Sequence, residues 1–205
     1  MKNPSSTYYG YVYEDDKTIL STSVGDFPLK KGMYFSLPGC GVISGGKGIV
    51  IEREEFKGFF TLGGPIEEKG RLKYIDGCTD SILVPPVKLG DPCLNVLYFP
   101  PHINQTEHTH SSVRIVMVAK GRGECITRNA DISSEKEYIP LVPGTIFVVR
   151  EEQLHAFRTF DDSEMVVVAY HPDSDFGPQD DNHPMLNRTI VSGTSAAEIE
   201  TIKTK

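Results

Sequence analysis

All six histidines of the chain lie after residue 101, so any imidazole chemistry belongs to the second half of the sequence. His108 and His110 are two positions apart, and residues with this spacing on a β-strand point to the same face. His155 follows a Pro-Gly turn on a segment that can lie opposite them. Three imidazoles around one ion leave positions open for water, oxygen or substrate, which is the pattern of a catalytic metal site. We therefore predict that these three histidines bind one divalent transition metal; the alternative is that they are hydrogen-bonded polar residues of a protein that has lost its metal.

Arg114 follows His110 by four positions and, under strand alternation, points to the same face. A guanidinium cannot bind a metal ion, and burying one without an anionic partner costs several kcal/mol. Two partners fit equally well: a substrate carboxylate held by paired N–H donors, or a neighbouring Asp or Glu. The first alternative makes Arg114 a catalytic residue that holds a small anionic substrate.

The remaining histidines and the cysteines do not fit a second site. We expect His102 in a turn or at the surface, and structural roles or a place at the pocket mouth for His171 and His183. The four cysteines lie far apart with no Cys-x-x-Cys pair, which favours free thiols in a reducing cytosol.

Glycine and proline, 19 and 14 residues, separate short runs rich in Val, Ile, Tyr, Phe and Thr, and this pattern indicates strands joined by tight turns. Such a series is typical of an all-β sandwich or barrel. Only residues 195–202 have the spacing of a short helix. The predicted strands are 8–13, 18–22, 32–37, 48–52, 59–62, 71–75, 81–85, 93–99, 107–119, 124–127, 138–142, 145–149, 155–160 and 164–170.

Composition excludes several classes of protein. With 39% apolar and 24% charged residues, the chain is neither disordered nor a coiled coil. The net charge of −7 and the scattered lysines and arginines argue against a nucleic-acid surface. No run approaches the roughly 20 apolar residues of a membrane span, and the first residues lack a secretory apolar region. We therefore expect a cytoplasmic protein with no nucleic-acid or membrane partner.

The first histidine segment resembles the first motif of the cupins, which reads Gly, five residues, His-x-His, three or four residues, Glu, six residues, Gly. His108, His110 and Gly121 match this motif in type and spacing. The chain departs from it at His102, which stands in place of the first glycine, and at Arg114, which stands in place of the glutamate. Any metal here would therefore have three protein nitrogens and no carboxylate ligand.

The second segment resembles the second cupin motif, in which a Gly-containing turn is followed by an apolar strand, a His and an Asn. Gly144 and His155 have the familiar separation of eleven, and Thr159 stands in place of the Asn. The resemblance covers roughly residues 93–171. It implies an all-β, cupin-type double-stranded β-helix, which is a jelly-roll barrel that often binds Fe, Mn, Ni or Zn.

The resemblance also implies a domain division and a function for this chain. We expect a β-rich half over residues 1–90, a metal-binding cupin barrel over 91–190 and a polar tail over 191–205. The first half is either a degenerate second cupin-like barrel or an extension that supplies dimer contacts, and we expect the protein to be a homodimer. The resemblance to three-histidine cupins favours an Fe(II)-dependent dioxygenase that acts on a small anionic substrate as the function of this chain. A metal-dependent lyase, isomerase or decarboxylase, and a non-catalytic binding cupin, are the alternatives, because one fold hosts many functions.

Overall fold

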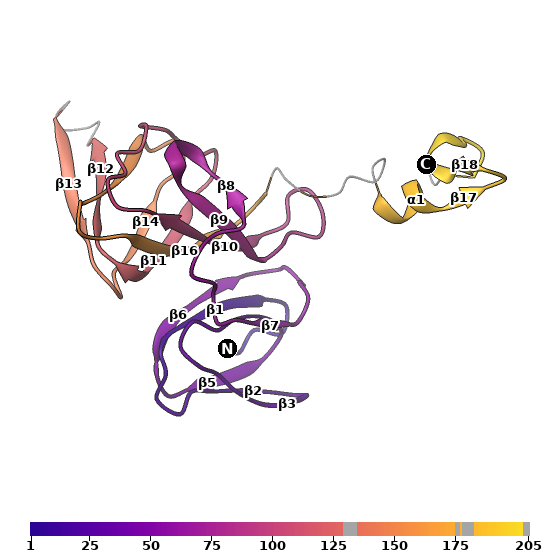
Figure 1. Ribbon diagram of the computed structural model, residues 1–205. Helices are drawn as coiled ribbons and strands as arrows, with labels where there is room; N and C mark the ends of the chain where they lie inside the picture. Colours follow the sequence, from indigo (N-terminus) through magenta and orange to yellow (C-terminus); the bar gives the residue numbers. More distant parts are fainter. Residues whose placement is uncertain (129–134, 175–176, 178–182, 203–205) are drawn as a thin grey trace.

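The computed structural model describes residues 1–128, 135–174, 177 and 183–202, and it is built almost wholly of short strands (Figure 1). The first half forms two sheets, in the orders β6-β1-β4-β7 and β3-β2-β5. Its strands are β1 (Thr7–Glu14), β2 (Ile19–Thr22), β3 (Gly25–Pro28), β4 (Tyr34–Pro38), β5 (Gly41–Ser44), β6 (Lys47–Arg53) and β7 (Thr61–Gly63). A buried cluster that includes Leu20, Leu29 and Phe35 fills this half.

The second half also forms two sheets, in the orders β14-β11-β16-β10-β9-β8 and β13-β12-β15. Its elements are β8 (Leu72–Lys73), the 3-10 turn η1 (Ile75–Gly77), β9 (Thr79–Val84), β10 (Cys93–Phe99), β11 (Arg114–Gly121), β12 (Gly123–Arg128), β13 (Lys136–Leu141), β14 (Ile146–Val149), β15 (His155–Thr159) and β16 (Met165–His171). The two sheets share one apolar core, in which Val118, Leu141, Phe157 and Met165 are buried together. The predicted all-β class is confirmed, with the opposed sheets of a jelly roll.

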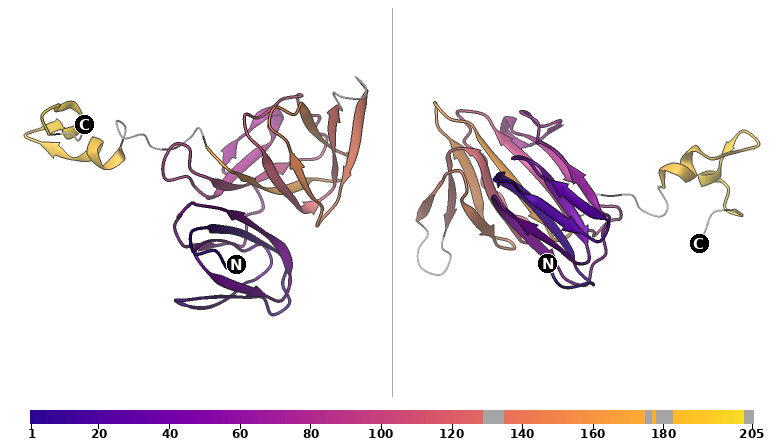
Figure 2. Two further views of the ribbon diagram at one scale, coloured as in Figure 1. Left: turned by 180° about the vertical axis from the view of Figure 1, so that it is seen from behind. Right: turned by 90° about the horizontal axis from the view of Figure 1, so that it is seen from below.

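Strand β16 shows how the sequence makes a sheet that is covered on both faces. Its run of apolar residues alternates, with Met165 and Val167 facing the core of the second half and Val166 and Val168 facing the first half. On the latter face Tyr9 of β1 packs against Tyr170, with ring centroids 5.1 Å apart. The first half is thus packed against the outer face of the six-stranded sheet (Figures 1 and 2).

The chain passes from the sheets of the first half to a sheet of the second half before residue 90. Strands β8 and β9, which end at Val84, lie in the sheet of β10 rather than in the sheets of the first half. The expected division into domains 1–90, 91–190 and 191–205 stays a prediction, but part of the residue 1–90 segment builds a wall of the second sandwich.

The C-terminal segment contains α1 (Pro184–Arg188), β17 (Ile190–Val191), β18 (Thr194–Ser195) and the 3-10 turn η3 (Ala196–Glu198). The prediction of a helix over 195–202 is therefore wrong. The Ser195 hydroxyl accepts a hydrogen bond from the Ala197 backbone N–H, which caps a single turn, and so few residues do not propagate an α-helix without tertiary support.

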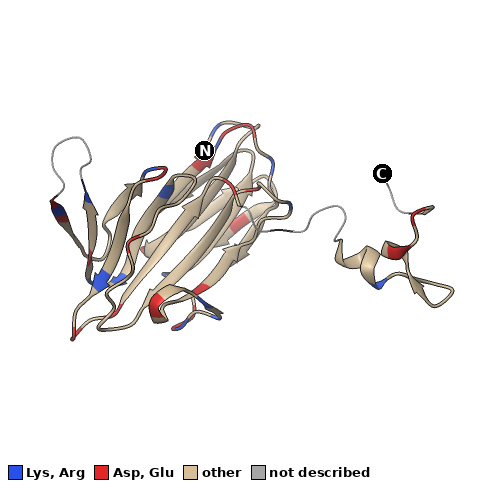
Figure 3. Cartoon of the chain, turned by 90° about the horizontal axis from the view of Figure 1, so that it is seen from above, with Lys and Arg blue, Asp and Glu red and all other residues tan. Residues whose placement is uncertain are grey.

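Charged residues of both signs are interspersed over the chain rather than gathered on one sheet (Figure 3). Within the described part of the chain, no helix is long and apolar enough to cross a membrane.

Candidate metal centre

His108, His110 and His155 come together at one end of the second sandwich. Each offers a ring nitrogen, and these three atoms lie within 4.8 Å of one another. The ring centroids are 4.5 to 5.1 Å apart. Three nitrogens gathered in this way are candidates to share one ion, which imidazole ligands bind at roughly 2.0–2.1 Å. The donor set therefore fits a mononuclear transition-metal site of the kind that we predicted.

The backbone brings these residues together by a route that differs from the expected one. The predicted strand over 107–119 is wrong in its first part, because the ladder of β11 begins only at Arg114. His108 instead forms an isolated bridge with His155, with N–H to carbonyl distances of 2.9 and 3.0 Å in the two directions. Backbone bonds from Gln105 to Phe157 and from Glu152 to His110 extend this contact. The loop is thus held along β15 without being a regular strand.

In two of the imidazoles, those of His108 and His155, Nδ1 forms a hydrogen bond with a backbone carbonyl oxygen. Nδ1 of His108 lies 2.8 Å from the carbonyl oxygen of Thr106, and Nδ1 of His155 lies 2.9 Å from that of Gln153. A carbonyl can only accept, so each Nδ1 carries the proton and donates it. This tautomer leaves Nε2 with a lone pair for a metal, which is the usual way in which backbone partners orient metal-binding histidines.

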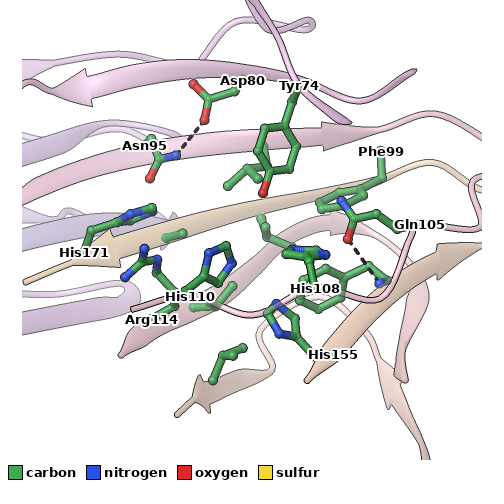
Figure 4. A pocket seen from close by; sticks show the side chains of 16 residues that line it. Tyr74, Asp80, Asn95, Phe99, Gln105, His108, His110, Arg114, His155 and His171 are labelled. Carbon is green, nitrogen blue, oxygen red and sulfur yellow. Dashed lines mark hydrogen bonds between the residues drawn. The ribbon is translucent and has the colours of Figure 1, made fainter. Parts of the chain in front are cut away.

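The histidines open into a cavity of about 260 Å³ (Figure 4). Apolar side chains of five strands, β10, β11, β14, β15 and β16, form much of its wall, among them Phe99, Val116, Val149, Phe157 and Val167. Its polar lining residues outside the three histidines are Tyr74, Asp80, Asn95, Gln105, Arg114 and His171. A metal at this end would therefore face a small, largely apolar chamber with a few placed polar groups, as ligand sites commonly do.

Arg114 lines the cavity beside His110 and His171 (Figure 4). One of its terminal nitrogens, Nη1, donates hydrogen bonds to the carbonyl oxygens of Ser112 at 2.9 Å and Val113 at 3.2 Å. The side chain thus braces the loop between the metal-site histidines and β11. It carries a fixed positive charge at the cavity wall. Strand alternation predicted this side of the chain for Arg114, although residues 109–113 do not form a strand.

Three polar cavity residues were missed by the sequence reasoning: Tyr74, Asp80 and Asn95. They come from the loop after β8, from β9 and from β10, and no motif links them to the histidines. The fact that Asn95 is a polar residue within the buried strand β10 was the one available signal.

The structure also places the three remaining histidines, His102, His171 and His183. His102 is a surface residue in a turn, with a positive φ of 64° and its Nδ1 2.9 Å from a carboxylate oxygen of Asp161. His183 lies outside the cavity and caps α1 by accepting from the Met185 N–H. His171 lies in the cavity wall, and all four cysteines are free thiols.

Burial lowers the pKa of three of the cavity histidines, His110, His155 and His171. Burial, the Arg114 charge and the neighbouring imidazoles lower the pKa of His110 to about 4. Burial, Arg114 and His110 lower the pKa of His171 to about 3. Burial also lowers the pKa of His155.

These depressed pKa values predict acid-sensitive folding of the metal-free protein. Between about pH 6.5 and 4 these histidines bind protons in the unfolded chain but not in the folded chain. The free energy of unfolding therefore decreases as the pH is lowered. Each such group contributes at most about 1.4 kcal/mol per pH unit. Urea unfolding of chelator-treated protein at pH 7, 6 and 5 should show this decline. His171→Gln should flatten the slope, whereas the exposed His102→Gln should not; equal slopes in both variants and wild type would contradict the assignment.

No model of a known protein family matches the chain, and no curated protein matches it. Solved structures do. A protein described as glyoxylate-induced, from Pseudomonas aeruginosa, is 12% identical with a TM-score of 0.63, covering 87% of this chain and 69% of that one. A cupin 2 conserved barrel domain protein from Leptotrichia buccalis is 12% identical with a TM-score of 0.60, covering 84% and 76%.

A third structure, salicylate 1,2-dioxygenase from Pseudoaminobacter salicylatoxidans, is 10% identical with a TM-score of 0.53, covering 81% of this chain and 63% of that one. At such low identity these likenesses speak for fold and not for activity. They agree with the opposed sheets of the second half. The chain therefore has the fold of the cupin superfamily.

Proposed function

We propose that the chain is a mononuclear non-haem metal enzyme, an Fe(II)-dependent dioxygenase that acts on a small anionic organic substrate. The observation that carries the proposal is the convergence of three imidazoles, with ring nitrogens within 4.8 Å of one another, at the end of a mostly apolar cavity. Three protein ligands leave coordination positions toward that cavity. The dioxygenase that shares the fold is a precedent for this activity.

The residues of the chain divide the work of such a site. His108, His110 and His155 would hold the ion, and the backbone carbonyls behind His108 and His155 keep their rings oriented. Bound Fe(II) would supply the redox chemistry that combines dioxygen with an organic substrate. Arg114 would hold the anionic group of the substrate, which also offsets the charge of the ion.

The apolar wall has a separate role. Phe99 and Phe157 pack with ring centroids 5.5 Å apart next to the histidines. They leave room for the substrate but few partners for water, so charges inside the cavity interact more strongly than they would in bulk solvent.

The test is oxygen consumption by untagged protein reconstituted anaerobically with Fe(II). Salicylate, gentisate and glycolate are the first probes, because all three are small hydroxylated carboxylates. Protein loaded with Zn(II), which has no redox chemistry, is the control. Substrate-dependent oxygen uptake by the Fe(II) form alone would support the proposal. Turnover without oxygen uptake, equal with Zn(II), would instead indicate a lyase, isomerase or decarboxylase, and tight binding without turnover would indicate a binding protein.

A further inference from the structure

Two buried amides in the cavity have one end fixed by the protein and the other end turned toward the ligand space. They are Asn95, with 7% of its surface exposed, and Gln105, with 4%. Both line the cavity that the three histidines face (Figure 4). A buried polar atom without a hydrogen bond costs about 1–3 kcal/mol, so such atoms need an explanation.

The polarity of Asn95 is set by Asp80. The Asn95 Nδ2 donates to a carboxylate oxygen of Asp80 at 2.6 Å. A carboxylate can only accept, so the amide must present its NH₂ group to Asp80 and its oxygen to the other side. That oxygen, Oδ1, is buried and has no hydrogen-bond partner among the described residues. In Figure 4 it points away from Asp80, on the side of the cavity that holds His171 and Arg114.

The polarity of Gln105 is set in the same way, with the opposite result. Its Oε1 accepts from the backbone N–H of Phe157 at 3.3 Å. A backbone N–H can only donate, so the NH₂ group of Gln105 is left on the other side. This nitrogen is also buried and without a partner within the described part of the chain. Gln105 thus offers a donor at the end of the cavity near His108, and Asn95 offers an acceptor at the far end (Figure 4).

From this pair of amides we infer that Asn95, oriented by Asp80, determines specificity by accepting a hydrogen bond from a hydroxyl or N–H group of the substrate. The inference rests on the proposed anionic substrate and narrows it to small carboxylates that also carry such a donor. The cavity volume of about 260 Å³ equals roughly nine water molecules, which limits the ligand to a comparable number of non-hydrogen atoms. A substrate without the donor would leave Oδ1 buried and unsatisfied, which is how buried polar groups reject a close analogue.

The experiment compares pairs of probes in which a hydroxyl is exchanged for a methyl group of similar size. One series sets 3-hydroxypropanoate, 4-hydroxybutanoate and 5-hydroxypentanoate against butanoate, pentanoate and hexanoate. A second series sets the three hydroxybenzoates against the three methylbenzoates. Affinities are measured by calorimetry on Zn(II)-loaded protein, which binds without redox turnover. At least one hydroxyl probe should bind about ten-fold tighter than its methyl partner.

Variants assign that preference to a residue. Asn95→Leu keeps the size of the side chain and should bring the pair to within about two-fold of each other. Asp80→Asn frees the amide of Asn95 to turn, so it should reduce the preference while Asn95 remains. Gln105→Leu is the matched control, because it removes an amide at the opposite end and should keep the preference. Unchanged metal content reports that each variant is folded.

Three outcomes would overturn the inference. One is that no hydroxyl probe binds tighter than its methyl partner; another is that the preference survives in both Asn95→Leu and Asp80→Asn. The third is that Gln105→Leu, rather than Asn95→Leu, abolishes the preference. The proposed dioxygenase activity fails separately: a hydroxyl preference that depends on Asn95, without oxygen uptake by the Fe(II) form, would remove the activity and leave the specificity intact.

Discussion

Replacing His110 or His155 by alanine should empty the metal site. Each supplies one of three nitrogens within 4.8 Å of one another, and no carboxylate of the described residues belongs to that group. Loss of a residue that only supports a ligand typically costs 10- to 100-fold in metal affinity, so loss of a ligand should exceed about 100-fold. We expect the same for His108→Ala. Metal analysis of untagged protein after dialysis, followed by competition with a chelator, measures the change.

The chain offers a matched control for this experiment. His102→Ala removes a histidine of the same segment that is exposed and paired with Asp161, so metal content should not change. Wild type should hold about one ion per chain, because residues 1–101 contain no histidine. Full metal retention by all three cavity variants, or a reproducible content near two ions per chain, would show that the site is wrongly assigned.

His155 has only 1% of its surface exposed, so its alanine variant also leaves a void in the core. His110 is half-buried and separates the two effects. If both variants lose metal but only His155→Ala loses stability in the absence of metal, the metal loss is a ligand effect rather than a consequence of unfolding.

The histidine site could be predicted from the sequence because its signals are local. His108 and His110 are neighbours, and the turn at Gly144 fixes the distance along the chain to His155. Gly121 of the first motif has a φ of 71°, and a side chain there would collide with the carbonyl of Glu164. Such positions keep their residue type for steric reasons, so they can be recognised without a structure.

The far wall of the cavity could not be predicted, because its residues are assembled by long-range strand pairing. Asp80 and Asn95 are brought together by the pairing of β9 with β10, and β10 reaches the histidine side only through β16 and β11. Neither residue stands in a motif. The same limit applies to the loop before β11, where strand alternation was assumed but bonds to β15 and the turn preceding it determine the path. Alternation predicts a face only where a regular ladder exists.

Replacing Arg114 should weaken the binding of anionic ligands while metal is retained. The cavity places this guanidinium beside His110 and His171, where its charge helps to lower the pKa of both imidazoles. Its planar fork can hold a carboxylate through two hydrogen bonds, whereas a lysine acts as a point charge. Loss of one charge-assisted contact typically costs about 1.5–3 kcal/mol, or roughly ten- to a hundred-fold in affinity. Arg114→Lys and Arg114→Gln should both lose affinity for the tightest carboxylate probe, with the larger loss in the glutamine variant.

The same side chain also braces the loop through the carbonyl oxygens of Ser112 and Val113, so its two roles must be separated. Metal content does this, because a loop that collapses would misplace His110 and release the ion together with the carboxylate. Ligand affinity that falls while metal content stays constant assigns Arg114 to the anion. Removing its charge in Arg114→Gln should in addition raise the pKa of His171, as NMR titration can follow, and the lysine variant should raise it less. If both variants bind the probe as tightly as wild type does, Arg114 is a structural brace and does not bind the anionic group of a substrate.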